Sequence, residues 1–501
     1  MRVTLPLFFL LGLLQVARAD VTLAALFQDR MVLQRGRPVP IWGRAEPEEK
    51  VTVSFGQQEV STTTPADGRW ILYLDALETQ ANPTEMVVTG KNRVVIADVL
   101  VGEVWLASGQ SNMEWSLQRA ERGAEEVAAA DYPLIRMFKV EQAVSETPTD
   151  TMKGAWQTTH PSQAGGFSAV GYFFARDLYR KLGVPIGVIH SSWGGTGVEA
   201  WMSPAALASD PAFAVVNERW KKNLEEYPAR MESYMTQLEA WTAEQAAAKA
   251  SGQPFNQRRP AAPDGPGSKR TPTGLFNAMI NPVLPYALRG VIWYQGENNA
   301  DRATEYHALF ASMITFWRAH FGQGDFPFFW VQLANFNAGH PQGTHWAVLR
   351  EAQSKALALP DTGQAVAIDI GDPVDIHPRN KQEVGRRLAM IAKAQVYGIP
   401  GDFSGPVFAS AEKERNGMRV RFEHAVTGLI ARDRPLQSFE VAGADRIFRP
   451  ARAVIDGDTV VVSSPEVRDP VAVRYAWSNA PVANLYNGAG LPAAPFRSDD
   501  W

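Results

Sequence analysis

A serine presented on a turn is the residue of this chain best placed to do chemistry. The apolar run 104–107 stops at Ser108-Gly109, and Ser111 follows with an amide side chain on either side. A strand that ends in glycine and is followed by a serine exposes that hydroxyl at the end of a sheet. With a base and an oxyanion site beside it, such a hydroxyl becomes an acyl-transfer nucleophile. A rival nucleophile is Ser192, whose segment falls one residue short of a G-x-S-x-G elbow because position 190 is His.

The base should be a histidine, because imidazole is neutral near pH 7 and can take the hydroxyl proton. Of the eight histidines, His377 follows an apolar run and has acids close by. Asp375 is our candidate for holding the second ring nitrogen, as in a Ser-His-Asp triad. Two alternatives stay open. Asp372 takes this role if Pro373 turns the chain tightly, or Ser111 and His377 work as a dyad.

Negative charge that develops on the substrate needs hydrogen-bond donors. We expect them from the backbone N–H of Ser111, from a backbone N–H of Gly194 or Gly195, and from the side-chain amide of Asn298. Glycine suits a loop whose backbone must approach a ligand closely. The simpler interpretations are that the two glycines form an ordinary turn and that Asn298 caps a helix.

Four polar clusters of this kind each close an apolar run. They span residues 107–115, 189–201, 293–300 and 369–381. Strands are expected at 101–107, 186–190, 291–294, 326–333 and 366–370, with helical patterns between several of them, as at 167–178 and 381–397. Alternating strands and helices predict an α/β fold with a parallel sheet, in which the four clusters converge at the carboxyl ends of the strands.

The chain divides by pattern into several parts. Residues 1–19 read as a signal peptide, because a short apolar run precedes Ala17-Arg18-Ala19. Short strand-like runs predict an N-terminal β-sandwich over 20–100 and a C-terminal β module over 405–501. The α/β domain lies between them, over 101–404. We expect 204–272 to interrupt it as a helical insertion followed by a mobile loop rich in Pro and Gly.

Composition limits the partners and the chemistry. The net charge of −4 and the lack of a basic run argue against nucleic acid. The predicted mature chain has no segment long enough to span a membrane, and the absence of cysteine excludes disulfide and thiol chemistry. Asp369, Asp372 and Asp375 are a conceivable cation cluster, but a polar loop serving His377 is the better interpretation. We therefore expect no metal or organic cofactor. The oligomeric state is left open.

These motifs resemble the SGNH-hydrolase superfamily, and more closely its sialate O-acetylesterase family of carbohydrate esterases. Ser111 in GQSNMEW resembles the Ser block, and WGGT at 193–196 the Gly block. YQGENN at 294–299 resembles the Asn block, and DIHP at 375–378 the His block. Many superfamily members place the acid three residues before the histidine, where this chain has Val374. The resemblance covers essentially the whole predicted mature chain.

The resemblance implies an SGNH-type three-layer α/β/α hydrolase domain that removes O-acetyl groups from carbohydrate through an acetyl-Ser111 intermediate. The predicted signal peptide implies export to the periplasm or the medium. The resemblance leaves the sugar open: O-acetyl sialic acid, or a plant or algal polysaccharide such as xylan, xyloglucan or pectin. A non-catalytic carbohydrate-binding protein is the rival from another class, and a peptidase or lipase is a further one. The side chains expected to contact substrate are Gln110, Trp115, Trp193, Gln295 and Glu297.

Overall fold

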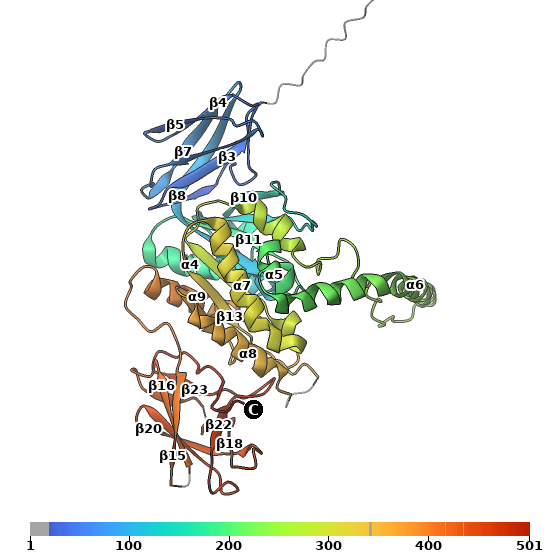
Figure 1. Ribbon diagram of the computed structural model, residues 1–501, viewed down its shortest axis with the longest axis vertical. Helices are drawn as coiled ribbons and strands as arrows, with labels where there is room; N and C mark the ends of the chain where they lie inside the picture. Colours follow the sequence, from blue (N-terminus) through green and yellow to red (C-terminus); the bar gives the residue numbers. More distant parts are fainter. Residues whose placement is uncertain (1–19, 340–342, 416, 434) are drawn as a thin grey trace, which may run out of the picture.

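The computed structural model describes residues 20–339, 343–415, 417–433 and 435–501. The predicted signal peptide over residues 1–19 lies outside the described residues. Within them, the molecule has a mixed α/β middle part with a mainly antiparallel β part at either end (Figure 1). No helix of the described part is long and apolar enough to cross a membrane.

The middle part is organised around strands in the order β10-β9-β11-β8-β12-β13-β14. They are β8 (Arg93–Gly109), β9 (Tyr132–Val140), β10 (Gly154–Thr159), β11 (Ile186–Ser192), β12 (Gly290–Tyr294), β13 (Phe328–Gln332) and β14 (Thr362–Val366). All neighbours are parallel except β10 and β9. β11, β12 and β13 are buried at nearly every residue, which explains the continuous apolar runs. The strand predicted at 366–370 was misplaced, because β14 ends at Val366.

Helices pack beside this sheet. The two predicted from their apolar stripes are α4 (Ala169–Leu182) and α9 (Lys381–Gln395), which pack on each other and on the sheet. The other α-helices are α1 (Ser111–Glu114), α2 (Gly123–Ala128), α3 (Pro161–Ala164), α5 (Pro204–Ala208), α6 (Ala214–Ser251), α7 (Ala303–Phe321) and α8 (His345–Lys355). Short segments of other helix types are η1 (Leu117–Arg119), η2 (Val198–Ala200), η3 (Pro211–Phe213), η4 (Phe276–Ile280), η5 (Asn281–Val283), η6 (Glu297–Arg302) and η7 (Ala356–Ala358).

The N-terminal β part is continuous with the middle part. Its strands are β1 (Thr22–Leu23), β2 (Val32–Gln34), β3 (Val39–Arg44), β4 (Lys50–Phe55), β5 (Gln58–Thr63), β6 (Arg69–Leu74) and β7 (Gln80–Thr89). β8 pairs with β7 near its start and with β11 and β12 near its end. The predicted domain boundary at residue 100 therefore falls inside one strand, and buried apolar residues from both sides of it form one core.

The C-terminal β part has a core of its own. Its strands are β15 (Val407–Glu414), β16 (Gly417–Glu423), β17 (Leu429–Ala431), β18 (Phe439–Ala442), β19 (Arg449–Pro450), β20 (Arg452–Asp456), β21 (Thr459–Ser463), β22 (Ala472–Tyr475), β23 (Leu485–Asn487) and β24 (Phe496–Arg497). Tyr486 donates a hydrogen bond to the carboxylate of Asp369, 3.1 Å away, which also pairs with Arg387 of α9. This buried contact joins the C-terminal part to the segment before His377.

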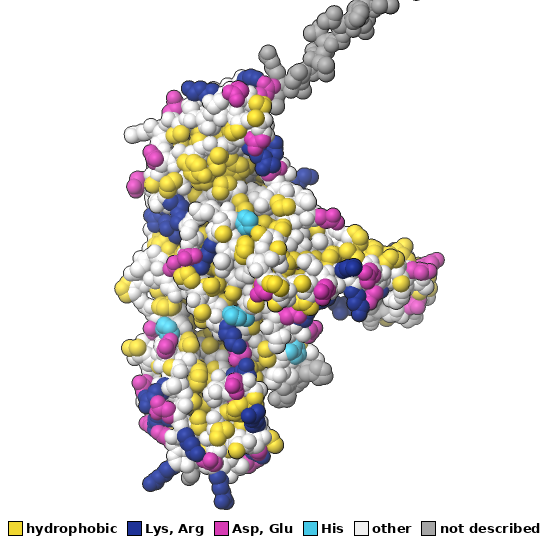
Figure 2. Space-filling view, viewed as in Figure 1, with side chains coloured by type: hydrophobic (Ala, Val, Ile, Leu, Met, Phe, Trp, Pro, Cys, Tyr) yellow, Lys and Arg dark blue, Asp and Glu magenta, His cyan; other side chains and the backbone are white. Residues whose placement is uncertain are grey.

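The insertion is a 38-residue helix, α6, that projects from the body (Figure 1). On the face in Figure 2, charges of both signs are interspersed over the body and this helix. The segment predicted as a mobile loop has defined contacts with α6. The ring of Phe255 packs 5.4 Å from that of Trp241, whose indole N–H donates to the Gln257 carbonyl at 3.0 Å. Asn223 of α6 likewise donates to the Asp264 carbonyl at 3.0 Å.

Candidate active site

Ser111 is the first residue of α1, two residues beyond the end of β8. The turn requires glycine at position 109 for two reasons. Gly109 has φ +135°, and a Cβ there would lie 2.2 Å from the carbonyl oxygen of Tyr294 on β12. The same carbonyl accepts the backbone N–H of Gln110 at 2.9 Å. Close pairing of β8 with β12 therefore holds the turn that presents the serine.

His377 meets Ser111 across the carboxyl edge of the sheet. Its Nε2 lies 2.9 Å from the serine Oγ. The histidine comes from the loop that joins β14 to α9, so the pair links residues 266 positions apart. Histidine and serine at hydrogen-bond distance form the nucleophile–base arrangement of acyl-transfer enzymes.

Asp375 lies on the other side of the imidazole. Its Oδ1 accepts the backbone N–H of His377 at 2.9 Å and lies 3.6 Å from Nδ1. The carboxylate of Asp372 instead accepts the backbone N–H groups of Val374 and Asp375, at 2.9 and 3.3 Å. Asp372 thus shapes the turn, while Asp375 is the acid that faces the ring.

The imidazole is also fixed by stacking. The ring of Trp115 lies 5.1 Å from that of His377 at an interplanar angle of 17°, and the Arg119 guanidinium lies 3.7 Å from the Trp115 ring centroid. Burial lowers the pKa of His377 below its usual value, and Asp375 acts in the opposite, raising direction. Burial thus favours the neutral ring, which is the form that a base needs.

The predicted oxyanion donors differ in whether their N–H groups are free to bind substrate. The backbone N–H of Ser111 stands at the start of α1. The N–H of Gly194 is already used, because it donates to the Glu114 carboxylate at 2.7 Å. A Cβ at Gly194 would lie 3.0 Å from the Cβ of Ser111, so this turn sits directly beside the nucleophile. Gly195 has φ +74°, and no hydrogen bond of its N–H is found in the described structure.

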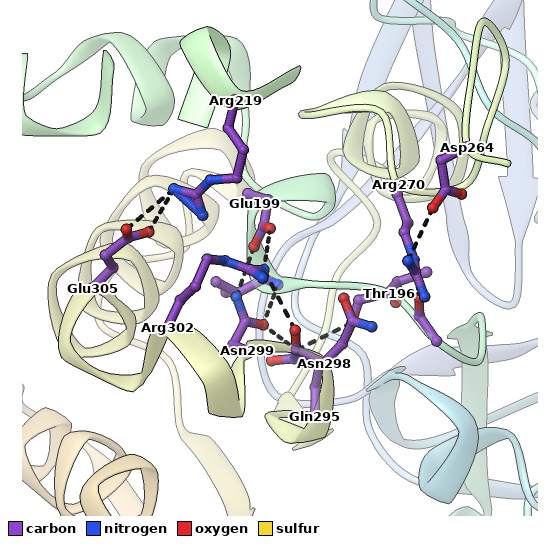
Figure 3. Close-up of polar contacts among 12 residues, drawn as sticks. Thr196, Glu199, Arg219, Asp264, Arg270, Gln295, Asn298, Asn299, Arg302 and Glu305 are labelled. Carbon is purple, nitrogen blue, oxygen red and sulfur yellow. Dashed lines mark hydrogen bonds and ion pairs between the residues drawn. The ribbon is translucent and has the colours of Figure 1, made fainter. Parts of the chain in front are cut away.

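Asn298 lies in η6, after β12. Its backbone N–H donates to the side-chain oxygen of Gln110 at 3.4 Å, which brings η6 next to the serine turn. Its carbonyl receives a bond from Arg302 at 3.4 Å, and the residue lines a cleft that also contacts α6 (Figure 3). In the described structure its side-chain amide makes no hydrogen bond to Ser111.

A buried polar network that the sequence analysis missed holds these segments together. The side-chain nitrogen of Asn112 donates to Glu297 at 2.6 Å and to the Ile376 carbonyl at 3.0 Å. Its oxygen accepts from the ammonium of Lys381. Burial lowers the pKa of Lys381 to about 7 and raises that of Glu297. The position of Asn112 inside the serine motif was a signal in the sequence that it could belong to the site. Lys381, a single lysine after the histidine motif, gave no such signal.

Four of the five residues expected to contact substrate have supporting positions instead. Gln295 is fully buried and donates to the Thr196 carbonyl and to Asn299. Trp115 is 7% exposed and packs on His377, and Gln110 is 3% exposed. The carboxylate of Glu297 is engaged by Asn112. Trp193 remains partly exposed, and its backbone N–H donates to the Gly109 carbonyl at 3.1 Å.

The rival nucleophile, Ser192, is the last residue of β11 and is 5% exposed. Its hydroxyl lies 2.6 Å from Nε2 of His190, two residues earlier on the same strand. Burial lowers the pKa of His190 to about 3. This pair therefore lies within the strand, whereas Ser111 is displayed on a turn. The structure brings Ser111, and not Ser192, to His377.

The aspartates considered as cation ligands are separated by their partners. Asp369 pairs with Arg387 through contacts of 2.6 and 2.8 Å, and Asp372 caps its own turn. Within the described ranges, no group of three or more His, Asp or Glu side chains is arranged to hold a metal ion.

Known proteins of one esterase family are similar to this chain. The family model described as "Carbohydrate esterase, sialic acid-specific acetylesterase" matches residues 269–394. Sialate O-acetylesterase of Mus musculus is 30% identical, with 94% of this chain and 93% of that protein covered. The Rattus norvegicus protein of the same name is 29% identical over 95% of this chain and 94% of its own length. The crystal structure of a carbohydrate acetylesterase from Xanthomonas citri is 42% identical, with a TM-score of 0.82, and the match covers 96% of this chain and 100% of that one.

Proposed function

The chain belongs to the sialate O-acetylesterase family, and we propose that it is a serine esterase in which Ser111 is the nucleophile and His377 the base. Family membership makes the protein a carboxylic ester hydrolase that removes O-acetyl groups from carbohydrate. The observation that carries the residue assignment is the 2.9 Å contact between the serine Oγ and Nε2 of His377.

The reaction runs in two steps. In the first, Ser111 attacks the acetyl carbonyl while its proton passes to Nε2 of His377, and the tetrahedral intermediate collapses to acetyl-Ser111 as the imidazolium protonates the departing sugar oxygen. In the second, His377 takes a proton from water, which attacks the acetyl-enzyme, and the imidazolium returns that proton to the Ser111 oxygen as acetate leaves. Asp375 stabilises the imidazolium in both steps.

The oxyanion site is assigned to the backbone N–H of Ser111, the N–H of Gly195 and the side-chain amide of Asn298. The N–H of Gly194 joins them only if it leaves Glu114 when substrate binds. Donors of this kind stabilise the negative charge that develops on the acetyl oxygen. The close approach of the 193–196 turn to Ser111 supports this assignment.

Two further parts of the proposal concern the fold and the location. The mixed sheet with its packed helices is consistent with a three-layer SGNH-type domain. The apolar run 5–14 and the Ala17-Arg18-Ala19 site support export to the periplasm or the medium. The acetylated carbohydrate is either O-acetyl sialic acid or a polysaccharide such as xylan, xyloglucan or pectin.

The assignment is tested by replacing the nucleophile. Ser111→Ala should lower acetate release by roughly 10³-fold or more, because the residual activity comes from binding and the oxyanion site alone. Ser192→Ala is the matched control and should keep turnover near wild type. A fluorophosphonate probe should label position 111. Near-normal turnover of Ser111→Ala, or labelling of Ser192, would overturn the assignment.

A further inference from the structure

A polar cleft of about 160 Å³ lies between the insertion and η6. The helix α6 contributes Arg219, Trp220 and Asn223 to its lining, and the segment after α6 contributes Arg270. On the other side are Glu199 of η2 and Asn298 and Arg302 of η6 (Figure 3). The cleft therefore exists only because the insertion covers η2 and η6. None of the four strand-end motifs by itself predicts it.

The cleft adjoins the nucleophile. Asn298 lines it, and the backbone of that residue contacts Gln110, the neighbour of Ser111. Two side chains of the segment after α6 also form hydrogen bonds with the turn beside the serine. Lys269 donates to the Gly194 carbonyl at 2.5 Å, and Arg270 donates to the Gly195 carbonyl at 3.0 Å. A group held in this cleft is therefore close to an acetyl group presented to Ser111.

The chemistry of the lining suits a sugar. Trp220 is partly exposed and offers an aromatic face, while the amide of Asn223 and three guanidinium groups offer polar atoms. Aromatic surface beside a few placed polar groups is a feature of ligand sites. Carboxylates beside these guanidinium groups supply hydrogen-bond acceptors. The hydroxyl groups of a sugar could therefore form hydrogen bonds with both donors and acceptors in the cleft.

Every guanidinium in this cleft has a carboxylate partner. Arg302 contacts Glu199 at 3.0 Å, and Arg270 contacts Asp264 at 2.9 Å (Figure 3). Arg219 contacts both oxygens of Glu305, at 3.1 and 2.9 Å.

Two further charges of opposite sign bind Gly194, beside the cleft. Lys269 binds the carbonyl of Gly194, and Glu114 binds the N–H of the same residue. The charges around the cleft therefore balance. A ligand carboxylate would lose its hydration there without gaining an unpaired cation.

We propose that this cleft binds the sugar that carries the acetyl group, and that it selects an uncharged sugar over one that bears a carboxylate. The proposal rests on the esterase function proposed above. It makes Trp220 and Asn223 of α6 specificity-determining residues, and it gives the insertion a role as one wall of the substrate site.

The first experiment measures whether the cleft binds sugar. kcat/KM is determined on an O-acetylated methyl glucoside and on 4-nitrophenyl acetate, which has no sugar. In Trp220→Ala the ratio of the two values should fall about tenfold, mainly through KM for the glucoside. Met235→Ala, an exposed position on the same helix, is the matched control and should leave the ratio unchanged. A ratio in Trp220→Ala equal to wild type would refute the sugar site.

The second experiment measures charge selection with a matched pair of substrates. O-acetylated methyl glucoside and methyl glucuronoside differ only in the carboxylate, and wild type should favour the uncharged one. Glu305→Gln removes the partner of Arg219 without changing shape, so relative kcat/KM should shift toward the glucuronoside by about fivefold at low salt. A wild-type preference for the glucuronoside, or no shift in Glu305→Gln, would refute charge selection. Full turnover by Ser111→Ala on both esters would instead refute the esterase assignment.

Discussion

Replacing Asp375 by Asn isolates the part played by the acid beside His377. The variant keeps the shape of the side chain and a carbonyl oxygen that can accept the His377 N–H, but it removes the negative charge. Coulomb's law gives an attraction to the imidazolium of about 1.2 kcal/mol at the dielectric of water, and about 4.6 kcal/mol at an effective dielectric of 20, for the 3.6 Å separation. The Asp375 side chain is 48% exposed, which favours the lower part of this range.

We therefore expect kcat/KM to fall about 10- to 100-fold, corresponding to about 1.4 to 2.7 kcal/mol of lost transition-state stabilisation. This is less than the ~10⁴-fold loss known for a buried triad aspartate. The pH profile gives a second, independent readout. Asp375 raises the pKa of His377, so its removal should move the acid limb of kcat/KM to lower pH, although the plateau also falls.

The assay is acetate release over pH 4 to 9 at fixed ionic strength. Asp372→Asn is the matched control, because its side-chain oxygen still accepts the N–H groups of the turn. It should stay within about threefold of wild type. The reasoning fails if Asp372→Asn is the more damaging change, or if Asp375→Asn leaves the acid limb in place. Two mild effects would indicate a Ser111–His377 dyad.

Three further changes test other parts of the site. Asn298→Ala should lower kcat by about 10²- to 10³-fold with little change in KM, because an oxyanion donor acts in the transition state; an effect confined to KM, measured by steady-state kinetics, would make it a ground-state contact. Lys381→Met should reduce the free energy of unfolding by about 1–3 kcal/mol in urea titration, because it leaves the buried Asn112 oxygen without its donor; unchanged stability would mean that the network contributes little. Prolonged chelation should leave acetate release intact, because the proposed steps use no Lewis acid; loss that one divalent ion restores would contradict this mechanism.

Local signals in the sequence were sufficient for much of the framework. The apolar runs predicted β8, β11, β12 and β13 because strands buried on both faces must be apolar throughout. The stripes of α4 and α9 were confirmed for the same physical reason, burial of one helix face. The last predicted strand was misplaced because Ala367 and Ile368 are buried beyond the end of β14, and burial alone does not distinguish a strand from a packed turn.

The sequence by itself determined which residues are available for the chemistry, because strand ends, glycine turns and the motifs of the family are local. Only the tertiary structure decided how side chains from distant segments share their hydrogen bonds. It turned the N–H of Gly194 to Glu114, stacked Trp115 on His377 and buried Lys381 against Asn112. It also set the insertion over η6 to form the cleft. These contacts depend on which groups come together when helices and strands pack. The spacing of residues along the chain does not predict them.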